Sequence, residues 1–190
     1  RWGSYVGGHA YSDEAIRRSV SAGVRTVEHG NFITPDTARL MLERDAFLVP
    51  TLITYHINKR LGPASGKSPE SLAKNEIVYD AGLTSLEICR QVGVPIGFGT
   101  DLSMHTQKYQ CDGFAIHRDA MPASDVLRSV LLVNARILRQ EGKLGELVPG
   151  AYADLLVVDG DPHADLGLFK EGGPNLAAIM KGGKFHKNTL

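Results

Sequence analysis

The chain has 190 residues, of which 43% are hydrophobic and 22% are charged, and its formal net charge is zero. This composition is typical of a globular protein that is long enough to bury a core. The balanced charge gives no electrostatic reason to expect nucleic acid or a membrane surface as a partner. No apolar run approaches the roughly 20 residues that span a bilayer, so we expect neither class of partner.

The two cysteines and the first residues add little about the cellular setting. Cys89 and Cys111 lack the spacing of a metal site or a redox motif, so a disulfide framework is not expected. The chain begins at Arg1 without a methionine or a signal-peptide pattern, and a strand-like run follows almost at once. We therefore expect the start to cut through a domain, which leaves the compartment unknown and the cytoplasm as a default expectation.

Strand-like and helix-like segments alternate in the first two thirds of the chain, which favours parallel βα units. Ser12, Thr34 and Ser68 are suited to cap helices, and Pro35 and Pro69 suit the first helical turn. We expect strands over 5–10, 24–29, 47–53 and 95–100, and helices over 12–23, 34–43 and 68–93.

The remainder of the chain changes character near Gly142. A long irregular stretch over 102–121 precedes a helix over 126–138, and long loops in compact domains are often functional. Beyond it we expect a short strand and turn over 147–150, a strand over 153–158 and a hairpin over 178–186 that turns at Gly182-Gly183. The predicted domains are an α/β domain over 1–141 and a β-rich segment over 142–190.

Three metal-competent side chains follow apolar strands of the α/β region. His9, His29 and Asp101 each fall at the expected end of a strand, and parallel strands bring such ends together around one pocket. Neutral imidazoles and a carboxylate are ligands suited to Zn²⁺, which lowers the pKa of bound water toward about 7. Asp101 is also placed to act as the base, and Tyr11 to donate a hydrogen bond to a developing oxyanion.

Other candidates have simpler explanations that the sequence leaves open. His105 and Gln107 follow Asp101 and are candidates for substrate contact, and His56 either lines the pocket or lies in a solvated loop. Glu28 alternates with His29 along its strand, so we expect Glu28 to point toward the helices and away from the pocket. A single strand histidine is most often structural, but two histidines and an aspartate at matching positions favour a metal site.

Six short segments occur in order along nearly the whole chain: HAYSDEAI at 9–16, VEHG at 27–30, VPTL at 49–52, GFGTD at 97–101, KLGELVPGAYADLLVVDGDP at 143–162 and IMKGGK at 179–184. Taken together, these segments resemble the metal-dependent amidohydrolase superfamily, and within it the prolidase-like and imidazolonepropionase-like members. Each piece is weak alone, and the ordered set is specific.

The resemblance implies an α/β fold: the C-terminal half of a (β/α)₈ barrel, strands 5–8, followed by the C-terminal part of a small β-sandwich. It implies that His9 and His29 hold one zinc ion of a binuclear site. It further implies that Asp101 holds the other and serves as the base. Tyr11 would polarise the scissile carbonyl and so contact the substrate. For His105, the expected contact with the substrate rests on its place in the loop after Asp101 and not on the resemblance.

The chain departs from the family pattern at two elements of the metal site. The His-x-His pair of strand 1 and the bridging lysine of strand 4 have no counterpart in these 190 residues. The expected partners are therefore a missing N-terminal half or another copy of the chain, in a possible homo-oligomer, besides a small-molecule substrate. We expect hydrolysis of an amide C–N bond in a dipeptide such as Xaa-Pro or in an N-acyl amino acid. A cyclic amide substrate and a catalytically inactive half-barrel that acts only in assembly are the alternatives.

Overall fold

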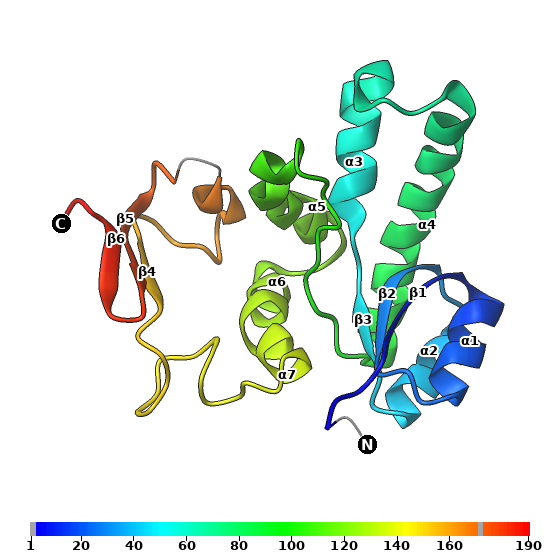
Figure 1. Ribbon diagram of the computed structural model, residues 1–190, viewed down its shortest axis with the longest axis horizontal. Helices are drawn as coiled ribbons and strands as arrows, with labels where there is room; N and C mark the ends of the chain where they lie inside the picture. The colour runs from blue at the N-terminus through cyan, green and yellow to red at the C-terminus, as the bar shows by residue number, and fades with distance from the viewer. Residues whose placement is uncertain (1–2, 171–172) are drawn as a thin grey trace. The chain divides into compact units, whose positions relative to one another are not determined.

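The computed structural model describes residues 3–170 and 173–190 (Figure 1). The chain divides into two compact units, Arg1–Gln107 and Lys108–Leu190. The first unit contains a parallel sheet with helices, and the second contains a helical segment followed by an antiparallel sheet. No helix in the described ranges is both long enough and apolar enough to cross a bilayer.

The first unit is organised around the parallel strands β1 (Gly7–Ser12), β2 (Thr26–Phe32) and β3 (Phe47–Val49), in the order β1-β2-β3. Helices α1 (Asp13–Ser21) and α2 (Pro35–Glu43) make the crossovers that parallel neighbours require. The register aligns one residue of each strand: His9 pairs with Glu28, and Glu28 pairs with Val49.

Helix starts follow the capping signals of the sequence. The hydroxyls of Ser12, Thr34 and Ser68 each accept a hydrogen bond from the backbone N–H three residues later. Pro35 and Pro69 occupy first-turn positions, where a missing N–H costs nothing. These three helix starts were predicted correctly because capping is a local interaction.

The core of the first unit lies between the sheet and its helices. Figure 1 shows α1, α2 and α4 (Pro69–Val92) beside the three strands. Five of these elements, α1, β2, α2, β3 and α4, contribute apolar side chains that are at most 1% exposed: Ile16, Val20, Val27, Ala38, Met41, Leu48, Leu86 and Cys89. Burial of this kind stabilises by about 25 cal/mol per Å² of apolar surface, so this shared core positions the strand ends.

The third and fourth predicted strands are shorter than expected. Pro50 has no N–H to continue a ladder, and β3 ends just before it at Val49. The segment that follows, predicted as strand through Ile53, instead forms helix α3 (Leu52–Leu61), which packs against α4. The expected strand over 95–100 is reduced to a parallel bridge between Leu48 and Ile96.

The second unit begins its regular structure with helices. The 3-10 helix η2 (Gln107–Asp112) leads into α5 (Gly113–Ala120), so the predicted irregular stretch over 102–121 is partly helical. The predicted helix over 126–138 is present as α6 (Ala123–Arg128), a π-helical turn (Ser129–Val133) and α7 (Asn134–Ile137).

The sheet of the second unit is antiparallel, with strands β4 (Leu155–Val158), β5 (Leu176–Lys181) and β6 (Lys184–Asn188) in the order β4-β5-β6. The Gly182-Gly183 hairpin is confirmed, and both glycines have positive φ angles of 56° and 76°. Of the short strand and turn expected over 147–150, the turn at Pro149-Gly150 is confirmed, whereas Leu147 and Val148 do not form a strand. A 3-10 helix (Leu166–Phe169) lies between β4 and β5.

Two residues of the predicted site adopt left-handed backbone conformations. The φ angle is 76° at His29, 60° at the adjacent Gly30 and 50° at Asp101. Positive φ is uncommon outside glycine and costs free energy for a residue with a Cβ. Gly30 must also lack a side chain, since a Cβ there would collide with Leu48. Two of the four non-glycine residues with positive φ in the described chain are therefore candidate ligands.

The left-handed conformation of Asp101 predicts an unusual order of stability among its variants. The free energy of unfolding of Asp101→Gly should exceed that of Asp101→Ala by about 1 kcal/mol, because the left-handed backbone is unfavourable for alanine but not for glycine. In urea titrations, Asp101→Gly should therefore unfold at the higher urea concentration. At Ser103, which is not among the positive-φ residues of the described chain, the same pair should show no advantage for glycine. An Asp101→Ala variant at least as stable as Asp101→Gly would contradict the strain.

Burial of His117 in α5 predicts a pH dependence of stability. This side chain is fully buried, Nδ1 donates to the Gly113 carbonyl at 2.9 Å, and burial lowers the pKa of His117 to about 4. Between pH 6.5 and 4 the unfolded chain therefore binds a proton that the folded chain does not.

Lowering the pH through this range should reduce the free energy of unfolding by about 3 kcal/mol, since one pKa unit corresponds to about 1.4 kcal/mol. Urea titrations at several pH values measure this loss. His117→Gln should flatten the dependence, whereas substitution of the exposed His163 should leave it unchanged; equal slopes in wild type and His117→Gln would refute the assignment.

Candidate active site

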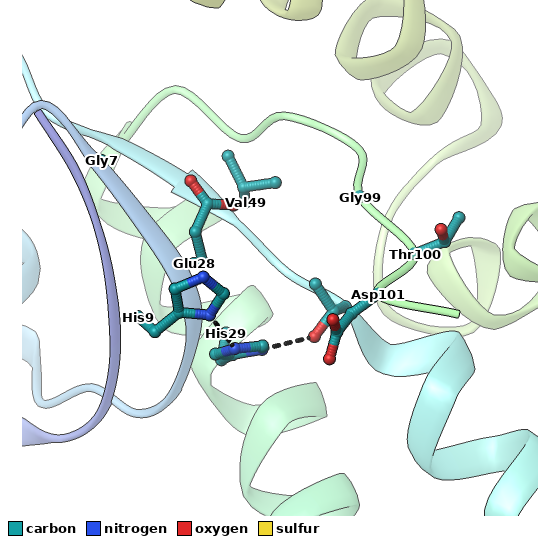
Figure 2. A pocket seen from close by; sticks show the side chains of 9 residues that line it. Gly7, His9, Glu28, His29, Val49, Gly99, Thr100 and Asp101 are labelled. Atoms are coloured by element: carbon teal, nitrogen blue, oxygen red, sulfur yellow. Dashed lines mark hydrogen bonds between the residues drawn. The ribbon is translucent and has the colours of Figure 1, made fainter. Parts of the chain in front are cut away.

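A pocket of about 420 Å³ lies in the first unit, where β1, β2 and the segment after Ile96 meet (Figure 2). It gathers residues from four separate stretches of the chain, as parallel βα units do at the carboxyl ends of their strands. Its walls are formed by Gly7, His9, Glu28, His29, Val49, Thr51, Gly99, Thr100 and Asp101.

Two imidazole rings face each other in this pocket. His9 Nδ1 lies 2.8 Å from His29 Nε2, and the ring centroids are 4.9 Å apart. His9 comes from β1 and His29 from β2, two neighbouring strands of the sheet. The two histidines therefore lie next to each other, as the sequence predicts.

The opposite side of the His29 ring is fixed by a hydroxyl. His29 Nδ1 lies 2.8 Å from Thr51 Oγ1, and the side chain is buried. Burial lowers the pKa of His29; the Asp101 charge opposes this effect and His9 reinforces it. A neutral ring whose Nδ1–H is held by Thr51 leaves the Nε2 lone pair directed at His9, an arrangement typical of metal-ligating histidines.

Asp101 enters the same pocket from the segment after Gly99. Figure 2 shows its carboxylate on the His29 side of the pocket, and its charge acts on the pKa of that histidine. The three predicted ligands His9, His29 and Asp101 thus share one pocket.

Tyr11 lies over the His29 ring, and its hydroxyl meets that of Tyr55. The Tyr11 and His29 centroids are 4.6 Å apart with planes at 17°, and Tyr55 donates to the Tyr11 hydroxyl at 3.1 Å. Tyr55 is buried, and this burial, together with the hydrogen bond to Tyr11, raises the pKa of Tyr55 above its ordinary value. Tyr55 therefore remains a hydroxyl donor.

The prediction for the direction of the Glu28 side chain is wrong. This side chain was expected to point toward the helices, because it alternates with His29, but both side chains line the pocket (Figure 2). The reason is the positive φ of His29, which breaks the alternation of a regular strand. Burial raises the pKa of Glu28, while a hydrogen bond from Thr26 and the nearby His9 partly offset the rise.

The remaining predicted side chains lie elsewhere. His105 is exposed and is not among the residues that line this pocket, and Gln107 opens the 3-10 helix η2. His56 lies on α3 with its ring 6.1 Å from that of Tyr79. Thr51 and Tyr55, which sequence analysis missed, are four residues apart. The signal that could have found them is this helical spacing, which the prediction of a strand concealed.

The donors present suit a metal ion but do not make a complete set. Two facing imidazole nitrogens and a nearby carboxylate match the chemistry of a zinc site. Across residues 3–170 and 173–190, however, no cluster of three or more histidine, cysteine or acidic side chains is close enough to hold a metal. A metal ion here would need further donors.

Comparison with known proteins relates this site to one family. The model of the amidohydrolase family matches residues 1–186. An uncharacterized protein of Mycobacterium tuberculosis is 31% identical over 185 residues, which are 96% of this chain and 48% of the relative. Ochratoxinase of Aspergillus niger is 25% identical over 183 residues, 96% of this chain and 38% of the enzyme.

A solved structure gives the same relationship in three dimensions. A prolidase crystallised with N-methylphosphonate-L-proline is 41% identical and superposes with a TM-score of 0.92, over 97% of this chain and 45% of the prolidase chain. The chain thus spans about half the length, or less, of the relatives that it matches. Its α/β fold and its match over nearly every residue show that this chain belongs to the amidohydrolase family.

Proposed function

We propose that this chain contributes His9, His29, Asp101 and Tyr11 to the active site of a metal-dependent hydrolase that cleaves an amide C–N bond. The observation that carries the proposal is the pair of facing ring nitrogens, 2.8 Å apart, in a pocket that also contains the Asp101 carboxylate. Membership of the amidohydrolase family supports this chemistry.

Each residue has a role that follows from its chemistry. His9 and His29 would hold zinc through the nitrogens that face each other, and Asp101 would supply a carboxylate to the same centre. When bound, zinc supplies a hydroxide nucleophile near neutral pH. Asp101 accepts the proton of the attacking water and passes it to the leaving amine. Tyr11 donates a hydrogen bond to the oxygen of the scissile carbonyl.

The architecture that we propose around this site is strands 5–8 of a (β/α)₈ barrel over residues 1–141 and part of a β-sandwich over 142–190. In this arrangement the remaining donors come from an N-terminal half or from a second copy of the chain. The coverage of about half of each relative supports this proposal. So does the free edge of β1, which pairs with β2 alone in the described sheet.

The proposed substrate is a dipeptide such as Xaa-Pro or an N-acyl amino acid. Support comes from the prolidase with its bound proline phosphonate, which is 41% identical to this chain. Ochratoxinase, at 25% identity, is a more distant relative. A cyclic amide is the alternative substrate within the same chemistry, and an inactive half-barrel that acts in assembly is the alternative without catalysis.

Metal analysis tests the ligand assignment. The complete product of the gene that encodes this chain, loaded with zinc and dialysed against metal-free buffer, should retain at least about one zinc per chain, because the remaining donors then join His9, His29 and Asp101. His9→Ala and His29→Ala should lose it, whereas the exposed His163→Ala should not. Elemental analysis measures the content and circular dichroism verifies folding. Equal zinc in all four proteins would remove His9 and His29 from the site.

Hydrolysis of a panel of substrates tests the reaction. The complete product of the gene that encodes this chain, loaded with zinc, should cleave Xaa-Pro dipeptides faster than cyclic amides. Asp101→Asn should lower kcat by about 1,000-fold, the range of general acid–base catalysis. Asp119→Asn, an exposed aspartate on α5 in the second unit, should leave kcat unchanged. Absence of cleavage by the metal-loaded protein would count against the reaction.

A further inference from the structure

Two tyrosine hydroxyls meet beside His29, and one of them has no part in the mechanism so far. Tyr55 lies on α3 and is 7% exposed, whereas Tyr11 on β1 is 40% exposed. The Tyr55 hydroxyl is 3.1 Å from the Tyr11 hydroxyl and 3.4 Å from His29 Nδ1. One buried group is therefore within reach of both a proposed catalytic residue and a proposed ligand.

The protons of this cluster can be placed by counting donors and acceptors. If His29 Nε2 keeps its lone pair for the pocket, Nδ1 carries the ring proton. The nearest acceptor for that proton is Thr51 Oγ1 at 2.8 Å, closer than Tyr55. Nδ1 then cannot accept from Tyr55. Thr51, which accepts the Nδ1 proton, has its own hydroxyl proton to donate to the Tyr55 oxygen, and this contact partly offsets the rise that burial causes in the pKa of Tyr55. The Tyr55 proton therefore goes to the Tyr11 oxygen. That hydrogen bond leaves the proton of Tyr11 itself unused within the cluster.

We propose that Tyr55 is a positioning residue, which occupies the Tyr11 oxygen as a donor and thereby turns the Tyr11 proton toward the substrate. The inference rests on the proposed function, since it concerns the residue proposed to bind the carbonyl oxygen. Tyr55 itself touches neither the substrate nor a metal. Its effect on the reaction is transmitted entirely through Tyr11.

The position of Tyr55 in the fold supports a role of this kind. Thr51 precedes α3 as its N-cap residue, yet its side chain makes no capping hydrogen bond and its hydroxyl contacts His29 instead. Tyr55 follows four residues later, on the same side of the first helical turn. A single helical turn therefore holds both the His29 ring and the Tyr11 hydroxyl, and it gives up a local cap in doing so.

A double-mutant cycle on the complete, zinc-loaded gene product separates positioning from mere packing. Tyr11→Phe should lower kcat by about 100-fold, the loss expected on removing an oxyanion donor. Tyr55→Phe should lower kcat by about 10-fold and leave KM unchanged. In the Tyr11→Phe background, Tyr55→Phe should have no further effect, because the residue through which it acts is gone.

The matched control is Tyr152→Phe, an exposed tyrosine of the second unit, which should behave as wild type. Phenylalanine keeps the volume of the Tyr55 ring, so folding should survive the substitution. An equal loss from Tyr55→Phe in both backgrounds would overturn the proposal, as would a change in Tm with no change in kcat.

A second measurement does not depend on catalysis. The chain contains six tyrosines, and labelling their Cζ atoms with ¹³C gives one signal each that is sensitive to hydrogen bonding of the hydroxyl. Tyr55→Phe should shift the Tyr11 signal, whereas Tyr152→Phe should not. An unmoved Tyr11 signal would overturn the positioning role. A shifted signal in a protein that cleaves no amide would uphold the hydroxyl contact and refute the proposed function alone.

Discussion

The hydrogen bond between His29 and Thr51 ties two strand ends together, and most of the pocket depends on it. It spans 2.8 Å and is buried, where a lost partner would leave a polar ring nitrogen without compensation. Through it, the end of β2 is held against the residue that follows β3 and Pro50. The orientation of the imidazole, and hence the direction of Nε2, is set by this contact rather than by the strand itself.

The backbone at His29 is the second constraint, and it works together with the first. A φ of 76° is unfavourable for histidine, and the adjacent Gly30 also has a positive φ. Regular alternation would send Glu28 and His29 to opposite faces of the sheet. The kink brings both into one pocket, with a half-buried carboxylate near His9 as a consequence. The cost of the kink is borne by the surrounding core, in which Leu48 and Ile33 pack against Gly30.

The first turn of α3 shows how function can override local preference. Thr51 has the right chemistry for a helix cap but contacts His29 instead, and Tyr55 directs a buried hydroxyl toward Tyr11. Departures from local rules are most often found at functional sites, where tertiary contacts repay their cost. Both side chains, Thr51 and Tyr55, lie within hydrogen-bond distance of Nδ1 of the same residue, His29.

Local signals in the sequence determined three helix starts and the Gly182-Gly183 hairpin, because capping and turns depend on nearby residues. The alternation of strands and helices indicated the parallel βα order, and from that order the grouping of His9, His29 and Asp101 could be expected. Tertiary structure alone decided the helix α3 and the direction of Glu28, whereas Pro50 marks the end of β3 in the sequence itself. The run after Pro50 has apolar and β-branched residues that suit either a strand or a helix, and packing against α4 selects the helix. Likewise, the positive φ of His29 is stable only within the packed sheet. The alternation of residues along one strand therefore does not predict it.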